Sequence, residues 1–455
     1  MFSWIGTINR LVWGVPGILL IAGTGIYLSA VSGFAQLRLF PNAWKTFVGK
    51  LRGGKTADGV SPMQALCTAL AATVGTGNLV GVAGAISLGG PGAVFWMWIC
   101  GLLGMVIKFA EAALAVQFRV RDGKNLLAGP MYMISRGLGE KWNFLAWIYS
   151  FFGVVAALGV GNATQINAVI TGINQMQLLF GMTPNRWGNL LLGIILAAMI
   201  LLMLLGGSKR IGETAERLVP FAAVAYLLLG AAVLIIRFDR IPQAFCAILR
   251  GAFNPKAVTG GAIGSALVAL RTGCARGVFT NEAGMGTAAI AHGSAEVSHP
   301  VEQGLLGIME VFLDTIVICT MTALVILVSG VEIPYGSDGG GILTDQAFAC
   351  VFGSWVTVIL TGCLCCFAFA TVLGWGFYGM RCTQYLFGTG AWKAFAWIQA
   401  AAVVLSSVLD TGIIWSLAET VNGLMMIPNL IALLLLSPVL RRLMGTYDSL
   451  RIGQA

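Results

Sequence analysis

Two long apolar segments of this chain are each interrupted by a short run rich in glycine, threonine and asparagine. The first run covers residues 71–78 and the second covers residues 273–284. Lipid offers no hydrogen-bond partner to backbone N–H and C=O groups, so irregular backbone at membrane depth persists only where it lines a cavity. Paired interruptions in corresponding places of two halves point to a binding site near the membrane midplane. The pattern predicts a protein that carries a solute across a membrane.

The composition supports a multi-pass membrane protein. Of 455 residues, 58% are hydrophobic and only 10% are charged, whereas soluble chains carry about 25% charge. About eleven apolar segments are long enough to cross a hydrocarbon core of roughly 30 Å. The expected spans are residues 11–35, 62–88, 91–118, 143–179, 187–206, 214–236, 260–298, 303–330, 350–387, 393–411 and 412–440.

The basic residues set the orientation. The alternate loops that begin with residues 36–61 and end with the C-terminus hold 18 Lys and Arg residues, against 6 in the other set. Cytoplasmic loops carry the excess of positive charge, so we expect the N-terminus outside and the C-terminus in the cytoplasm. This asymmetry accounts for the net charge of +9 without a nucleic-acid partner.

The interruptions fall in the second and seventh spans, which are five spans apart. Since five is odd, a repeat of the first five by the second five must run through the membrane in the opposite sense. The sequence therefore predicts an all-α polytopic fold with an inverted five-plus-five repeat. We divide it into residues 1–61, an added span and an amphipathic interfacial helix, and two repeats at 62–250 and 251–445.

Two motifs suggest chemistry that their context excludes. Residues 49–56 fit the P-loop pattern, but no strand precedes them and no soluble nucleotide-binding domain has room here. Cys363, Cys365 and Cys366 lie in an apolar run without a second Cys or His cluster, so we expect no metal centre and no cofactor. No hydrolase motif such as H-E-x-x-H or G-x-S-x-G appears, so we expect no enzyme.

Several long motifs resemble the alanine/glycine:cation symporter family, and the resemblance runs from about residue 62 to 442. They begin at Gly75 (GTGNLVGVA), Leu88 (LGGPGAVFWMW), Lys108 (KFAEAALA), Gly129 (GPMY), Ala275 (ARGVFTNEAGMG) and Phe369 (FATVLGWGFYG). The resemblance implies uptake of alanine or glycine with sodium across a bacterial or archaeal plasma membrane. It also implies a fold similar to that of the neurotransmitter:sodium symporters.

The first interruption has the chemistry of an amino-acid site. Half-helix N-termini present N–H groups that suit a carboxylate, Gly75 and Gly77 allow close approach, and Thr76 and Asn78 add polar groups. The alternative is plain helix packing, because Gly77 and Gly81 form a G-x-x-x-G pair. Carbonyl and hydroxyl oxygens of the unwound segments suit sodium. The candidate ligands are Ala71, Thr73, Val74, Asn78, Thr280 and Thr371, with Asp314 as a further possibility.

The resemblance implies further contacts with the substrate. Gln165 falls where the related fold contacts substrate, and Thr371 falls where it supplies a sodium-ligating hydroxyl; an interhelical hydrogen bond and a bond back to its own helix are the respective alternatives. We expect Phe279 and Thr280 to follow the second interruption, with Phe279 covering the ligand. Trp375 lies four residues after Thr371 and would limit substrate size, unless it is a packing residue or an interfacial anchor.

Charged residues in the spans usually mark function. For Glu282, Glu310 and Asp314 we weigh pairing with Arg271 or Arg276 against a role in an ion pathway. We expect Lys108 and Glu111 to pair within one helix. We expect His292 and His299 to lie in loops or at helix ends.

These features predict a sodium-coupled symporter for alanine or glycine that works by alternating access in the lipid bilayer. Proton coupling in the same fold is the first alternative. A channel is less well supported, because it needs a continuous polar pore and the sequence shows discrete interruptions.

Overall fold

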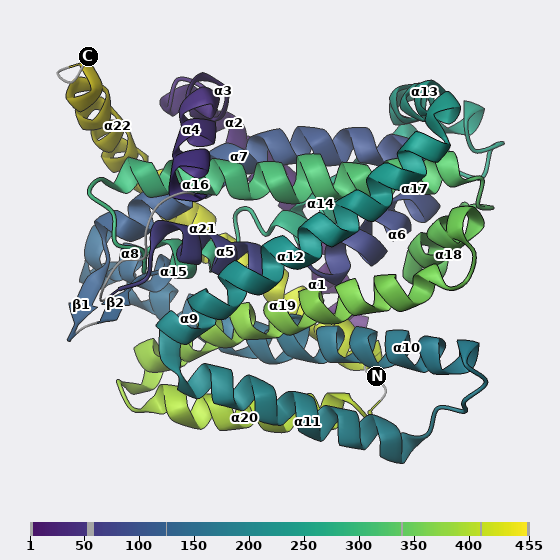
Figure 1. The fold of residues 1–455 in the computed structure, drawn as a ribbon. Coiled ribbons are helices and arrows are strands. Elements are labelled where there is room, and N and C mark those ends of the chain that lie inside the picture. Colours follow the sequence, from purple (N-terminus) through teal and green to yellow (C-terminus); the bar gives the residue numbers. More distant parts are fainter. Residues whose placement is uncertain (1–2, 52–58, 124, 338–339, 410–411, 453–455) are drawn as a thin grey trace.

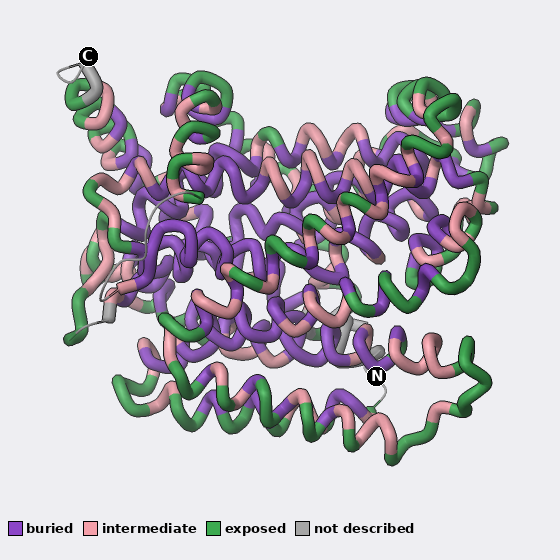
Figure 2. Tube along the Cα trace, in the orientation of Figure 1, coloured by how far each residue is buried: buried purple, intermediate pink, exposed green. Residues whose placement is uncertain are grey.

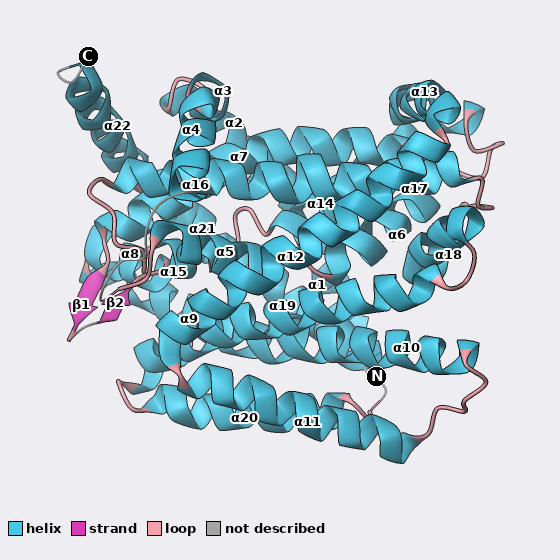
Figure 3. Ribbon diagram, in the orientation of Figure 1, coloured by secondary structure: helices cyan, strands magenta, loops and turns pink. Residues whose placement is uncertain are grey.

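The computed structural model describes residues 3–51, 59–123, 125–337, 340–409 and 412–452. Regular structure in these residues is helical (Figure 3) except for one antiparallel hairpin, in which Val120 pairs with Leu127. Its strands are β1 (Val120–Asp122) and β2 (Asn125–Leu127). The expected all-α class is confirmed. The P-loop-like run at 49–56 lies mostly outside the described residues.

The chain forms a continuous succession of helices. The first part contains α1 (Ser3–Val12), α2 (Val15–Val31), α3 (Ala35–Arg38), α4 (Phe40–Leu51), α5 (Pro62–Thr73), α6 (Val82–Gly89), α7 (Gly92–Gln117), α8 (Pro130–Gly137), α9 (Asn143–Leu158), α10 (Thr164–Leu179), α11 (Arg186–Leu205), α12 (Gly207–Ile236) and α13 (Ile241–Phe253). The second part contains α14 (Ala266–Asn281), α15 (Thr287–His292), α16 (Pro300–Val311), α17 (Thr320–Ser329), α18 (Gly340–Phe352), α19 (Val356–Phe387), α20 (Ala391–Ser406), α21 (Gly412–Leu435) and α22 (Ser437–Ile452). Wider π-helical turns join α6, α10 and α17 to the elements before them, at Gly77–Gly81, Gly159–Ala163 and Phe312–Cys319.

Membrane-spanning length is reached many times. Among the described residues, seven helical stretches are long and apolar enough to cross a bilayer, and counting two bent pairs as single spans gives nine. The two other predicted spans correspond to the interrupted pair α14–α15 and to α20, which has only 16 residues. Each of the eleven predicted segments therefore has a helical counterpart.

The helices divide into an interior group and a peripheral group, as Figure 2 shows. The most apolar window of α7 is 83% buried, whereas those of α11 and α12 are only 22% and 28% buried. In water such exposed apolar helices would be unfavourable, but they suit contact with lipid. α7 is consequently an interior helix, able to shelter the charged side chains that it carries.

The two ends of the bundle differ. The hairpin, α8 and α22 lie at one end of the long helices, and α13 and α18 lie at the other (Figure 1). We call the end with α13 and α18 the outer end, following the predicted orientation. The predicted division at 250/251 falls inside α13, and the division into repeats stays a prediction.

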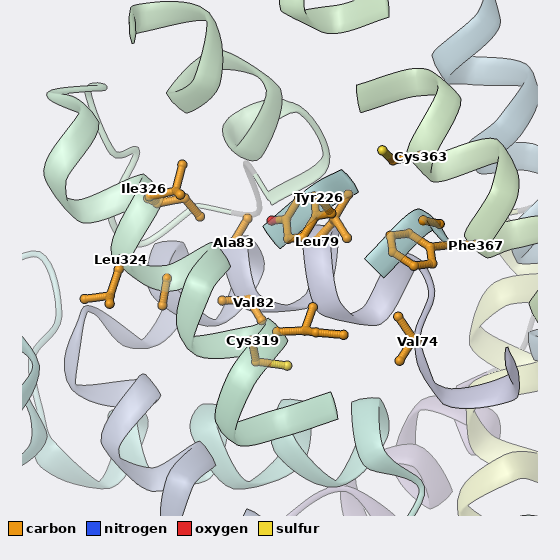
Figure 4. Packing of buried hydrophobic residues seen from close by; sticks show 14 of the residues in the cluster. Val74, Leu79, Val82, Ala83, Tyr226, Cys319, Leu324, Ile326, Cys363 and Phe367 are labelled. Atoms are coloured by element: carbon orange, nitrogen blue, oxygen red, sulfur yellow. The ribbon is translucent and has the colours of Figure 1, made fainter. Parts of the chain in front are cut away.

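The first broken helix lies in the interior. α5 begins with a reciprocal cap, in which Gln64 N donates to Ser61 Oγ and Ser61 N donates to Gln64 Oε1, each at a distance of 3.1 Å. Pro62 occupies the first turn of this helix. After Thr73 the chain leaves the helix, and the second half is bent by 51° from the first. Figure 4 shows Val74 of this bend near Phe367 of α19, and Leu79 near Tyr226 of α12.

Candidate functional site

The side chain of Asn78 organises the first break. Its Oδ1 accepts a hydrogen bond from Gly75 N at 2.9 Å, which replaces a bond lost where the helix opens. Its Nδ2 donates to Oδ1 of Asp314 at 2.6 Å, in the π-helical turn between α16 and α17. Asn78 and Asp314 are both fully buried. The asparagine therefore holds the break in shape from inside the protein.

A chain of hydrogen bonds continues from Asp314 to the second break. Thr315 Oγ1 donates to Oδ2 of Asp314 at 2.8 Å, and Asn281 Nδ2 donates to Thr315 Oγ1 at 3.1 Å. Asn281 Oδ1 then accepts from Ala283 N at 3.0 Å, just beyond the end of α14. The two breaks are thus connected through the turn at Phe312–Cys319. Thr315 and Asn281 were not predicted as members of the site.

Gly75 lies where three elements meet. A Cβ atom built on Gly75 would lie 2.8 Å from Thr371 Oγ1 of α19 and 3.4 Å from Gln165 Oε1 of α10. Only glycine therefore leaves space between the first break, Thr371 and Gln165. The three candidates that the sequence singled out separately are brought together here.

Thr371 bridges two helices with its hydroxyl. Oγ1 lies 2.9 Å from the carbonyl oxygen of Ala71 in α5 and 2.9 Å from that of Phe367 in its own helix. A hydroxyl has a single proton, so it can donate to only one of these carbonyls at a time. Both the bond back to its own helix and the contact with α5 that the site requires are therefore available.

Gln165 faces the first break. Its Nε2 donates to Thr76 Oγ1 at 3.2 Å and reaches Val160 O at 3.5 Å. Its Oε1 is buried and has no hydrogen-bond partner among the described residues. Buried polar atoms are nearly always paired, so this carbonyl oxygen next to Gly75 marks a place for a hydrogen-bond donor.

The second break lies further along the chain than predicted. Residues 273–281 are helical, and the chain opens only at 282–286, where Glu282, Gly284 and Gly286 have φ angles of 54°, 93° and 75°. The expectation that Phe279 and Thr280 follow the break is wrong, because both lie in the last turn of α14, before it. Helical hydrogen bonding persists through this turn, since Glu282 N still bonds to Val278 O at 2.8 Å.

Thr280 nevertheless faces the first break. A Cβ atom built on Gly77 would lie 3.0 Å from Thr280 Cγ2. The Thr280 hydroxyl lies 2.8 Å from Gly277 O and 3.0 Å from Arg276 O, so in this conformation it donates within its own helix. Thr73 behaves alike, with its hydroxyl 3.3 Å from Ala69 O.

Glu111 of α7 holds the second break. Its Oε1 accepts hydrogen bonds from Gly284 N at 3.0 Å, from Gly286 N at 3.1 Å and from Asn429 Nδ2 at 2.7 Å. Asn429 also donates to Gly284 O at 2.9 Å. One carboxylate thus accepts hydrogen bonds from backbone N–H groups that an uninterrupted helix would pair with its own carbonyl oxygens. No local sequence pattern indicates this role, because the side chains that hold the break come from α7 and α21.

Trp375 is an interior residue. Its indole is 1% exposed, and Nε1 donates to Oε1 of Glu282 at 3.0 Å. A Cβ atom on Gly161 would lie 2.1 Å from Trp375 Cβ, so α19 packs directly on the π-helical turn before α10. The proposed alternative of an interfacial anchor is therefore wrong.

The buried charges form a network that differs from the expected pairs. Lys108 Nζ lies 3.0 Å from Oε1 of Glu310, and His292 Nε2 lies 2.8 Å from Oε2 of the same carboxylate. Gln303 Nε2 lies 2.7 Å from the other ring nitrogen of His292. The expectation that Lys108 pairs with Glu111 is therefore wrong, because Lys108 pairs with Glu310.

The expected partners of the acidic residues also change. Arg276 pairs with Glu419 of α21 at 3.8 Å, not with Glu310 or Asp314, and Arg271 is exposed. His292 is the last residue of α15 and His299 caps α16, so the expectation of helix-end positions is confirmed. Within the described part of the chain, no group of three or more His, Cys, Asp or Glu residues could hold a metal ion.

The fold is that of solved membrane transporters. The crystal structure of MhsT in complex with L-phenylalanine matches with a TM-score of 0.58 over 86% of this chain and 99% of that chain. The two sequences are only 13% identical, so this likeness concerns the fold alone. Together with the paired breaks in the interior, it defines a multi-pass helical membrane fold. The family to which the chain belongs makes it a transporter, not an enzyme.

The family follows from the whole sequence. The sequence model of the sodium:alanine symporter family matches residues 1–454, and the chain belongs to that family. The chain is 43% identical to an uncharacterized transporter of Haemophilus influenzae, over 96% of this chain and 94% of that protein. It is 39% identical to the sodium/alanine symporter AgcS of Methanococcus maripaludis, over 100% of this chain and 98% of that protein.

Proposed function

We propose that this protein is a sodium-coupled symporter that imports small neutral amino acids, alanine or glycine, by alternating access. The observation that carries the proposal is the meeting of Gly75, Gln165 and Thr371 at the first break, where Gln165 Oε1 lacks a partner among the described residues. The identity to a relative named as a sodium/alanine symporter supports the same substrate class.

The amino acid would bind between the two breaks. Its carboxylate suits the start of the half-helix after the first break, because the N–H groups of Thr76 and Gly77 and the helix dipole converge there. Gly75, whose own N–H is held by Asn78, allows the carboxylate to approach closely. Its ammonium group suits Gln165 Oε1. The remaining candidates for the pocket wall are Asn78, Phe279, Thr280, Thr371 and Trp375.

Sodium would bind beside the substrate. The carbonyl of Ala71 and the hydroxyl of Thr371, 2.9 Å apart, are hard oxygen ligands contributed by two different helices. The carbonyl of Val74 extends this set. A second candidate set is the Asp314 carboxylate with Asn78, which bonds to it. Thr280, which faces Gly77, and Thr73, the last residue of α5 before the first break, complete the candidate ligands. An ion that joins α5 to α19 would raise substrate affinity, and the coupling must be reciprocal.

Proton coupling is the second candidate, because Glu310 and His292 form a buried ionisable pair 2.8 Å apart. Such pairs act as proton relays in other pumps and transporters. For either ion, we place the protein in a bacterial or archaeal plasma membrane with its N-terminus outside.

The experiment is uptake of radiolabelled alanine into proteoliposomes at fixed pH. An inward sodium gradient should drive saturable accumulation, and replacement of sodium by choline should abolish it. Accumulation driven by a proton gradient in choline would instead establish proton coupling. Unlabelled glycine, D-alanine and glutamine, added as competitors, would define the substrate range. Non-saturable flux without accumulation would contradict a carrier.

A further inference from the structure

The N-terminal helix α1 ends against the outer part of the candidate site. Trp13, the residue after α1, is 8% exposed, and its ring contacts that of Phe279 edge to face with centroids 5.8 Å apart. Phe279 occupies the last turn of α14, two residues before that helix ends. Trp13, just after the helix that lies outside the two predicted repeats, thus contacts an aromatic residue three positions before the second break.

The same tryptophan binds the helix on the other side. Trp13 Nε1 donates to the carbonyl oxygen of Glu419 in α21 at 3.0 Å. One turn earlier, Asn9 Nδ2 lies 3.1 Å from Thr420 Oγ1 and 3.5 Å from Oε2 of Glu419. α1 therefore carries polar contacts to both the backbone and the carboxylate of one residue on α21.

Glu419 is itself the partner of Arg276. The ion pair joins α21 to α14 over 3.8 Å, and its side chains are 25% and 21% exposed. Arg276 lies one turn before Phe279 or Thr280, on the outer side of the second break. A partly exposed ion pair between two helices that flank a binding site is suited to open and close. Trp13 touches both halves of this closure, through Phe279 and through Glu419.

The end of α1 packs in close contact with α21 at a glycine. A Cβ atom on Gly423 would lie 2.3 Å from Val12 Cγ1 and 3.0 Å from Trp13 Nε1. The chain then turns at Gly14, and a Cβ atom on Gly17 would overlap Val12 O. α1 consequently packs closely against α21 at Gly423, and Trp13 and Gly14 interrupt the helix between α1 and α2 within one membrane-spanning stretch, Gly6–Val31.

We propose that Trp13 is a positioning residue of the outer closure: it holds Phe279 over the amino acid and holds Glu419 toward Arg276. The inference rests on the proposed function, in which Phe279 covers the substrate. Any outward movement of α14 away from α21 must separate the Trp13 and Phe279 rings or break the hydrogen bond to Glu419. The helix therefore stabilises the closed state, and its removal should favour outward opening.

Trp13→Ala tests this directly. In detergent at saturating sodium, we expect labelled alanine to dissociate about tenfold faster, as loss of an aromatic pair and a hydrogen bond implies. Trp13→Phe keeps a ring against Phe279 but removes the N–H donor. Its rate of alanine dissociation should therefore lie between those of the unmodified protein and of Trp13→Ala. Trp187→Ala is the matched control, because Trp187 is 79% exposed and should leave the rate unchanged.

Coupling to Phe279 separates positioning from general stability. Trp13→Ala should have a smaller further effect on the rate when Phe279→Ala is already present, because only the hydrogen bond to Glu419 is then left to lose, whereas a merely structural role would add in full. Amide hydrogen exchange over residues 276–286, without substrate, should also be faster in Trp13→Ala. An unchanged dissociation rate and unchanged exchange in a folded variant would overturn the inference.

The proposed function and this inference fail differently. If the unmodified protein neither binds nor accumulates alanine, the proposed function is wrong, and the exchange measurement still decides whether Trp13 holds the closure. If the unmodified protein transports alanine and Trp13→Ala changes only its melting temperature, the positioning role is wrong. Should Trp13→Ala not fold, Trp13→Phe and Asn9→Ala provide the same two readouts.

Discussion

The indole N–H of Trp375 donates a hydrogen bond to Oε1 of Glu282 across 3.0 Å, joining α19 to the first residue after α14. The other carboxylate oxygen of Glu282 accepts from Thr287 Oγ1 at 2.7 Å, at the first residue of α15. One side chain therefore connects both ends of the second break to the helix that carries Thr371. The wall of the candidate pocket and the break are mechanically linked through Trp375.

Trp375→Ala should widen the range of substrates. A bulky indole one turn beyond Thr371 leaves room for a methyl group but not for a branched side chain, so its removal should let valine or leucine compete with labelled alanine. The cost in stability should be about 3–5 kcal/mol, typical of a buried Trp or Phe truncated to Ala. Competition assays and thermal unfolding in detergent measure the two effects.

Trp375→Phe is the control for this prediction. It retains most of the bulk and loses only the hydrogen bond to Glu282, so the competition profile should stay narrow. An unaltered profile in Trp375→Ala would show that the indole does not limit substrate size.

Thr371→Val should shift the sodium dependence of transport. The substitution keeps the shape of the side chain and removes the hydroxyl that lies 2.9 Å from Ala71 O. Losing one interaction with a charged group costs ~1.5 kcal/mol or more, so half-activation should require about tenfold more sodium. Sodium titration of alanine uptake measures it, with substrate affinity at saturating sodium changing less.

Thr361→Val is a matched control on the same helix. Thr361 is also buried, and its hydroxyl lies 3.5 Å from Gly172 O, two to three turns away from Thr371. Equal sodium curves for Thr371→Val and the unmodified protein would assign the Thr371 hydroxyl to its own helix alone.

Those properties that depend on local sequence could be predicted. Segment length and apolarity gave helical counterparts for all eleven spans, and the amphipathic pattern correctly indicated the helix that became α4. The first break was located correctly because Gly75 and Gly77 directly precede a buried asparagine that can replace the lost backbone bonds. The glycines that indicate the break and the asparagine that stabilises it lie within four residues of one another, 75–78.

The second break was misplaced because glycine has two uses in a membrane helix. A Cβ atom on Gly273 would lie 2.2 Å from Ala93 O, and one on Gly277 would lie 3.3 Å from Met97 Cα, so both glycines allow α14 to approach α7. A single sequence does not distinguish close packing from unwinding. The pairing of Lys108 with Glu310 was missed for a related reason, since the partners are 202 positions apart.

Asn78→Ala should weaken substrate binding. The variant loses the acceptor for Gly75 N and the donor to Asp314, so the first break loses its shape while the surrounding helices remain packed. Removing a partner from a buried polar group costs about 1–3 kcal/mol, which corresponds to a roughly 5- to 150-fold loss of affinity if the cost falls on the binding-competent conformation. Equilibrium binding of labelled alanine to the purified variant measures it.

Asn162→Ala provides the comparison for Asn78. Asn162 is equally buried and also lies in a π-helical turn, but its Nδ2 donates to Gln399 O, away from Asp314. We expect it to affect stability more than affinity. Unchanged affinity in Asn78→Ala would remove this residue from the site.

Lys108→Ala should destabilise the protein strongly. The ammonium group is fully buried and is 3.0 Å from Glu310, so the substitution leaves this buried carboxylate without its cation and with His292 as its remaining partner. Breaking a buried ion pair in this way costs about 3–5 kcal/mol.

Arg38→Ala is the matched control, because Arg38 pairs with Asp448 at 3.2 Å with side chains 48% and 36% exposed, and such surface pairs contribute about 0–1 kcal/mol. Thermal unfolding in detergent should therefore show a much lower melting temperature for Lys108→Ala and a nearly unchanged one for Arg38→Ala. The double variant Lys108→Met with Glu310→Gln should recover part of the loss, since no charge is then left unpaired. Equal melting temperatures for Lys108→Ala and Arg38→Ala would mean that water or a rearranged His292 compensates Glu310, and that the pair does not stabilise the interior.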